Sequence, residues 1–332
     1  MTRRPAAQGG FTLIEMMVSL IIMTIVIGGV LGMAGTLTSA YQDSRRTAVA
    51  ERNARAVLDI ITDAVRNASP GVPRSDLQDL VGCSGTGGLT VTNSTTGPDQ
   101  LDVIHAIGGV VTSLRAPFTA SDTSLTLLDG SELRAGDYII VTNMDKGHIL
   151  EVSDVQPSGS EYSVTLTGSP SSLCSGVVFP SGDYAAGDLV VRAQVSRFYV
   201  DSSAAVDFMP TMMMDPDGDG PATAEPLAAG IEDFQVAVGV DTNGDGSLTD
   251  TASTGDEWFY NAAGDVAPPV ITTTPPRALR ITVVGRTLTE QSTQATMQRP
   301  AAEDHAAAST LDPYRRRVLS ATVEIRNLEG SP

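Results

Sequence analysis

A run of 22 residues without a charged side chain, from Met16 to Leu37, constrains this chain of 332 residues more than any other feature. A helix crosses a bilayer with about 20 apolar residues, whereas the apolar region of a cleaved secretory signal has about 7–15. We therefore expect a retained membrane-spanning helix. Glu15 directly precedes the run, and because a charge at the membrane edge costs free energy, we expect it to have a partner. The alternative is an ordinary signal anchor with Glu15 in the headgroup region.

The residues before the apolar run follow an unusual order. Arg3 and Arg4 come first, and Gly9-Gly10 and Phe11 follow them. A cut after the glycine pair would precede the membrane segment, whereas signal peptidase cuts its substrates after the apolar region. The segment Gly10-Phe11-Thr12-Leu13-Ile14-Glu15 resembles the class III leader of type IV prepilins and pseudopilins.

This resemblance implies a maturation step and a set of partners. Prepilin peptidase would cut between Gly10 and Phe11 and methylate the new amine of Phe11, so residues 1–10 are the expected leader. Glu15 would then set the register of assembly by pairing with the N-terminal ammonium of a neighbouring subunit. The implied partners are prepilin peptidase, other minor and major pilins, the inner-membrane pilus assembly platform and, before assembly, the inner-membrane lipid.

Apolar residues continue at three- and four-residue spacing beyond the uncharged run, which predicts a helix that extends to Ala68. Ser69-Pro70-Gly71 then ends the helix, because proline disfavours a helical residue before it. We expect a transmembrane half over residues 11–37 and an amphipathic half over residues 38–69 that packs on a head. The expected apolar stripe contains Tyr41, Ala48, Val49, Ala56, Val57, Ile60, Ile61, Ala64, Val65 and Ala68.

Residues 70–332 are expected to form a β-rich head. From about Gly88 onward, short β-branched runs alternate with turn residues, which predicts strands. The fold class is therefore α+β: a pilin-like lollipop with a long N-terminal transmembrane and amphipathic helix and a large, mostly antiparallel β head. Strands are expected over residues 101–107, 124–128, 138–142, 162–167, 189–200, 231–240, 278–288 and 317–327.

Charge and cysteine content favour an exported head. The formal net charge of −18 becomes −20 without the two leader arginines, and such a surface repels phosphates, so nucleic acid is not an expected partner. Cys83 and Cys174 are the only cysteines, and we expect one disulfide, with two unpaired thiols as the alternative. The resemblance of the leader implies the location: the inner membrane, single-pass with the N-terminus inside and the head in the periplasm, and then the pilus fibre or tip.

Segments at both ends of the chain resemble the large minor pilins of the PilW type. They are residues 52–68, 190–200, 227–236 and 314–327. Pseudopilin J of type II secretion shares the anchor and the broad layout, but it is shorter. The length of this chain and its Asp-rich turn favour the pilus protein, whereas residues 71–185 resemble no family.

Two aspartate-rich loops are candidate calcium sites. Alternating side-chain oxygens before a glycine can wrap a hard cation, as in an EF-hand, although the closing glutamate is replaced here by Ala252. Asp-Gly turns are also common in hairpins without metal. The first candidate ligand set is Asp241, Asn243, Asp245, Ser247 and Asp250, and the second is Asp215, Asp217 and Asp219.

Little in the sequence points to catalysis. His105, His148 and His305 are scattered, and none has a partner at a known motif spacing, so we expect a protein that is not an enzyme. The function implied by the resemblance is a minor pilin of a type IV pilus, incorporated at low copy to prime assembly or cap the tip. The alternatives are a type II secretion pseudopilin and a tip adhesin that binds a surface ligand.

Overall fold

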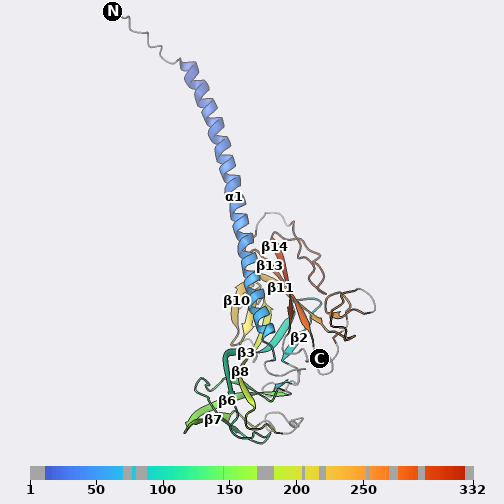
Figure 1. The fold of residues 1–332 in the computed structure, drawn as a ribbon. Coiled ribbons are helices and arrows are strands. Elements are labelled where there is room, and N and C mark those ends of the chain that lie inside the picture. Colours follow the sequence, from blue (N-terminus) through green and yellow to red (C-terminus); the bar gives the residue numbers. More distant parts are fainter. Residues whose placement is uncertain are drawn as a thin grey trace, which may run out of the picture. The chain divides into compact units, whose positions relative to one another are not determined.

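The computed structural model describes residues 12–69, 77–79, 88–144, 146–169, 183–203, 206–216, 222–251, 255–265, 267–268, 276–290 and 296–325. The chain divides into two compact units, Met1–Ala48 and Val49–Pro332. One helix, α1 (Leu13–Arg66), contains residues of both units (Figure 1). Sequence periodicity placed this helix over residues 11–68, close to its observed bounds.

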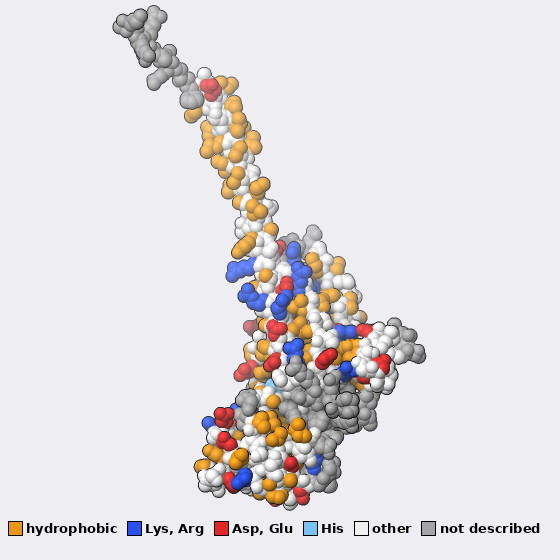
Figure 2. Space-filling view, viewed as in Figure 1, with side chains coloured by type: hydrophobic (Ala, Val, Ile, Leu, Met, Phe, Trp, Pro, Cys, Tyr) orange, Lys and Arg blue, Asp and Glu red, His pale blue; other side chains and the backbone are white. Residues whose placement is uncertain are grey.

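The described part of the first unit is helical from Leu13 onward, and it is apolar as far as Leu37. Every large hydrophobic side chain of α1 from Leu13 to Leu37 is exposed, and Figure 2 shows this surface in orange. The most apolar 18-residue window has a mean hydropathy of 2.4, so by length and composition the helix is able to cross a membrane. So large an exposed apolar surface requires lipid or other apolar helices around it.

In the second unit, the remainder of α1 is amphipathic. Its buried positions recur at three- and four-residue spacing, as a helix with one apolar face requires. The expected stripe was right for Val57, Ile61 and the residues that follow it, but Tyr41, Ala48, Ala56 and Ile60 are exposed. The buried helix residues of this unit are Ala50, Ala54, Val57, Leu58, Ile61, Ala64 and Val65.

The buried face of α1 shares one core with a four-stranded antiparallel sheet. The sheet has the order β12-β11-β13-β14, so the last strand in the chain lies at its edge. Phe234, Ile281 and Val323 point from three of these strands into the core that contains Ile61. The strands are β11 (Ile231–Gly239), β12 (Trp258–Phe259), β13 (Ala278–Arg286) and β14 (Arg316–Glu324).

A glycine permits the closest approach of helix and sheet. A Cβ atom on Gly285 of β13 would lie 2.9 Å from the Ala50 carbonyl oxygen and 3.1 Å from the Ala54 Cβ. The alanines on the helix and the glycine on the strand therefore allow the two backbones to pack without a side chain between them.

Gly285→Val should lower the free energy of unfolding by about 1–3 kcal/mol, because the added side chain forces β13 away from backbone that cannot yield. Gly35→Val is a useful comparison, since no atom lies within 4 Å of the corresponding Cβ position. Urea unfolding of the full chain in detergent micelles measures both. An unchanged midpoint for Gly285→Val would show that the helix does not pack this closely on the sheet.

The second sheet is larger and almost entirely antiparallel, with β1 on β6 as its parallel pair among the described strands. Its main path is β10-β9-β8-β5-β6-β7-β4, and β2 and β3 join it through β8, which Figure 1 shows beside β3. The strands are β1 (Leu77–Asp79), β2 (Leu89–Thr92), β3 (Gln100–Ser113), β4 (Ser124–Leu127), β5 (Tyr138–Thr142), β6 (Gly147–Ser158), β7 (Glu161–Leu166), β8 (Leu189–Asp201), β9 (Thr211–Asp215) and β10 (Glu225–Ala229).

The fold is thus α+β, with one long apolar N-terminal helix followed by a large, mostly antiparallel β head, as predicted. The head contains a second apolar core, within residues 114–190, that is built without α1. There Phe118 stacks on Tyr184 with ring centroids 6.3 Å apart, and Ile139 and Leu150 are fully buried. The region that resembles no family therefore has a hydrophobic core of its own.

Candidate functional site

Glu15 belongs to a capping box at the start of α1. Its Oε2 accepts hydrogen bonds from the Thr12 N–H and the Thr12 hydroxyl, both at 2.9 Å. In return, the Glu15 N–H donates to the Thr12 hydroxyl oxygen at 3.3 Å. The pair satisfies donors that a helix N-terminus leaves without intrahelical partners. This geometry gives Glu15 a partner inside its own chain, which the sequence analysis did not anticipate although the Thr-x-x-Glu spacing signals it.

Several predicted site residues lie outside the described part of the chain. These are Gly10 and Phe11 at the expected cleavage point, Cys83 and Cys174 of the expected disulfide, and Asp217 and Asp219 of the second aspartate-rich loop. Asp215 from that loop is described. It ends β9, is fully buried, and accepts a hydrogen bond from the Thr223 hydroxyl at 3.3 Å.

The first aspartate-rich loop brings three carboxylates together. One oxygen from each of Asp241, Asp245 and Glu257 lies within 4.8 Å of the others. The sequence analysis named the two aspartates but not Glu257, which follows Asp241 by 16 residues and so falls outside a 12-residue loop frame. The Glu257 N–H donates to the Thr249 carbonyl at 2.9 Å and thereby fixes this residue against the end of the loop.

The buried Glu257 carboxylate accepts hydrogen bonds from the backbone of the loop. Glu257 is 1% exposed, and its Oε1 accepts hydrogen bonds from the Thr242 and Asn243 N–H groups at 2.9 and 3.2 Å. Its Oε2 accepts from the Thr249 N–H at 3.0 Å. A buried carboxylate that holds three backbone donors is preorganised, and it lies near the partly exposed Asp241 and the exposed Asp245.

The remaining predicted ligands of this loop differ in the residues that they contact. The Ser247 hydroxyl and the Asn243 amide donate to Asp245 at 2.7 and 3.1 Å, and the Ser247 contacts lower the pKa of Asp245. Asp250 instead forms an ion pair with Arg280 at 2.8 Å, so it lies outside the carboxylate cluster. Arg277 is 3.4 Å from Asp241 and compensates part of the cluster's negative charge. A cation bound here would therefore compete with a guanidinium.

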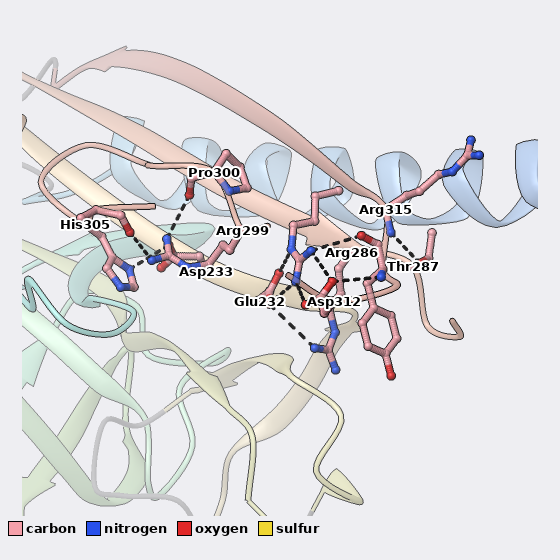
Figure 3. Close-up of polar contacts among 12 residues, drawn as sticks. Glu232, Asp233, Arg286, Thr287, Arg299, Pro300, His305, Asp312 and Arg315 are labelled. Carbon is pink, nitrogen blue, oxygen red and sulfur yellow. Dashed lines mark hydrogen bonds and ion pairs between the residues drawn. The ribbon is translucent and has the colours of Figure 1, made fainter. Parts of the chain in front are cut away.

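A network of charged residues ties β14 to β11, and Figure 3 shows its members converging. The Arg316 side chain is 5% exposed and donates to Glu232 Oε1 at 2.9 Å and to Asp312 Oδ1 at 2.7 Å. Arg286 lies over the Tyr314 ring at 4.4 Å and 3.8 Å from Glu232. The planar guanidinium of arginine can donate hydrogen bonds to two carboxylates at once, whereas a lysine ammonium acts as a point charge. Arginine therefore suits this position.

The three histidines lie in separate places. His148 contacts the Tyr184 hydroxyl at 2.6 Å, and His305 is 2.9 Å from Asp233. His105 contacts the Ser196 hydroxyl at 3.0 Å beside a pocket of about 380 Å³ whose lining is mostly apolar. Ser196 is fully buried, which does not suit a nucleophile that must meet a substrate.

Comparisons with known proteins bear on both ends of the chain. Residues 197–327 match the family model of the type IV pilus-assembly protein W, PilW, and residues 5–31 match the prokaryotic N-terminal methylation motif. No curated protein matches the sequence. Among solved structures, the type IV-like pilin TTHA1219 from Thermus thermophilus aligns over 84% of this chain and 96% of its own length, with 10% identity and a TM-score of 0.37.

The two family matches coincide with features already described. The methylation motif covers the second half of the expected leader and the first part of α1, and the PilW match contains the whole four-stranded sheet and the Arg316 network. The chain thus has a region similar to PilW at residues 197–327 and an N-terminal methylation motif at residues 5–31, which is the motif of class III leaders.

Proposed function

We propose that this protein is a minor pilin of a type IV pilus, incorporated at low copy to prime assembly or cap the tip. The observation that carries the proposal is the occurrence of the methylation motif and the PilW region in one chain. The apolar surface of α1 supports it, because such a helix finds its partners among lipid tails or other pilin helices. The size of the head also supports low copy number, because a head of some 260 residues would crowd its neighbours in a thin fibre.

Maturation by prepilin peptidase is the first step that this function requires. Mass spectrometry of the N-terminal peptide, with and without co-expressed peptidase, should find a methylated Phe11 terminus only when the peptidase is present. An intact Met1 under both conditions, or a cut beyond Leu37, would contradict processing at Gly10.

Two substitutions of Glu15 distinguish a role in helix capping from a role in charge pairing. Glu15→Gln keeps an oxygen that accepts from Thr12 but removes the charge, whereas Glu15→Leu removes both. We expect both variants to be processed and to stay in the membrane, and neither to enter sheared pili, as seen by immunoblot. Normal entry of Glu15→Gln together with loss of Glu15→Leu would leave only the capping role.

Deletion of the gene distinguishes the three functional alternatives. Loss of surface pili supports a primer, whereas normal pili with lost attachment support a tip adhesin. Blocked exoprotein release with normal pili supports a type II secretion pseudopilin. We expect the first outcome, because the PilW match covers residues 197–327 of the head and lies outside the shared anchor.

We also propose that Asp241, Asp245 and Glu257 form a calcium site. Three oxygens of one cluster, one of them preorganised by three backbone donors, suit a hard cation. Asp245→Asn should reduce calcium affinity at this loop about tenfold or more in a calorimetric titration of the full chain. Because Asp245 is exposed, the variant should unfold at the wild-type temperature without calcium. An unchanged calcium affinity would contradict the loop site and leave Asp241 as an ion-pair partner of Arg277.

A further inference from the structure

We propose that a second cation site is buried in the head, where oxygens of Asn93, Asp99, Gln235 and Asp304 hold a hard divalent cation such as Ca²⁺. None of these residues belongs to the aspartate-rich loops. They come from the segment 93–99, strand β11 and the turn 302–305, and we refer to them together as the buried oxygen cluster.

Hydrogen bonds bring the three segments of the cluster together. The Asp99 N–H donates to the Phe234 carbonyl at 2.8 Å, and the Val236 N–H donates to Asp99 Oδ2 at 2.8 Å, so Asp99 lies along β11. The Gln235 amide donates to the Gly97 carbonyl at 2.9 Å. The Asn93 amide donates to Asp304 Oδ2 at 2.8 Å and thus joins the turn to the same region.

Three side-chain oxygens of the cluster are buried without a hydrogen-bond partner among the described residues. They are Oδ1 of Asn93, Oε1 of Gln235 and Oδ1 of Asp304. Gln235 is fully buried and Asp304 is 4% exposed, so bulk water does not reach either side chain. A buried oxygen without a donor costs about 1–3 kcal/mol, and three of them in one region point to a ligand that supplies positive charge.

The charges of the cluster point the same way. Asp99 is 2% exposed, and among the described residues neither it nor Asp304 forms an ion pair.

The neighbouring Asp233 shows how this fold compensates a buried carboxylate. Figure 3 shows Arg299 and His305 directed at it, at 2.6 and 2.9 Å. Asp99 and Asp304 are buried nearly as deeply, but no arginine or lysine in the described part of the chain reaches them. Within the described part of the chain, these two carboxylates therefore lack the compensating charge that Asp233 has.

A cation fits the cluster better than a water molecule does. Water has two hydrogens to donate, so it leaves at least one of the three oxygens without a partner and does not compensate two carboxylates. A divalent cation accepts six or more oxygens and compensates both charges, with water completing its coordination. All the ligands present are oxygens, which favours calcium or magnesium over zinc or copper.

Calcium titration of the full chain in detergent micelles, after removal of bound metal with a chelator, tests the proposal by calorimetry. Asp304→Asn should weaken binding at the buried cluster about tenfold or more while leaving the loop site intact, and Asp245→Asn should do the reverse. Calcium should also raise the unfolding temperature of Asp245→Asn. Equal calcium binding by Asp304→Asn and wild type would overturn the proposal.

A second variant covers the case in which Asp304→Asn does not fold. Asn93→Asp adds a third carboxylate to the cluster, so it should bind calcium at least as tightly as wild type and lose more thermal stability when the metal is removed. If the added carboxylate lowers the unfolding temperature equally with and without calcium, the cluster holds no cation.

Discussion

Arg316→Ala should lower the free energy of unfolding by about 3–5 kcal/mol, which is a large part of the stability of a domain. The side chain is nearly buried between Glu232 and Asp312, and its removal leaves both carboxylates without their main partner. Hydrogen bonds to Arg316 are the largest cause of the lowered pKa of Asp312. The loss should therefore exceed that of an ordinary surface ion pair, which is worth about 0–1 kcal/mol.

The next residue provides the control for this prediction. Arg317 lies on the same strand and is exposed, so Arg317→Ala should change the free energy of unfolding by less than about 0.5 kcal/mol. Urea unfolding of the full chain in detergent micelles, followed by tryptophan fluorescence, measures both variants. Equal midpoints for the two would show that the network adds little to the cohesion of β11 and β14.

Acidification should destabilise the head through His148. Burial is the main cause that lowers the pKa of this imidazole to about 4, and the nearby Lys146 adds to the effect. An unfolded histidine has a pKa of about 6.5, so between these values the unfolded chain binds more protons than the folded one. Stability is therefore fully present above about pH 6.5 and falls by roughly 3 kcal/mol as the pH approaches 4.

About 2 kcal/mol of this loss should occur between pH 7 and pH 5, above the range in which most carboxylates titrate. Unfolding at the two pH values should show the loss in wild type and a smaller one in His148→Gln. The glutamine keeps a polar group near the Tyr184 hydroxyl, which contacts the imidazole at 2.6 Å. The same pH dependence in both proteins would assign the effect to other groups.

Local signals in the sequence were sufficient for the main elements. The uncharged run and the apolar spacing predicted α1 nearly to its ends, and each expected strand coincides with one in the structure. β6, β9 and β10 were not expected, because proline, aspartate and methionine within them obscure the alternation that marks a strand. Their pairing determines their conformation instead: β6 pairs with β5 and β7, β9 pairs with β8, and β10 pairs with β9.

The site residues, like the strands, could be predicted where they lie close together in the sequence and not where the fold brings them together. Asp241 and Asp245 could be named from their spacing, because the loop that holds them is continuous. Glu257 reaches that cluster only because the chain returns to form β12 beside β11, and Asp250 turns away because the same sheet places Arg280 within 2.8 Å of it. Asp99 and Asp304 are some 200 residues apart in the chain, and no local pattern connects them.

The packing of α1 on β13 and β14 sets an order of events during synthesis. β13 and β14 follow the helix by more than 200 residues and supply Ile281 and Val323 to the core that contains its apolar face, so this core is complete only when nearly all of the head has emerged. Contacts between such distant parts of a chain form slowly. Val57 and Ile61 therefore keep part of their core-facing surface uncovered until β13 and β14 have been synthesised.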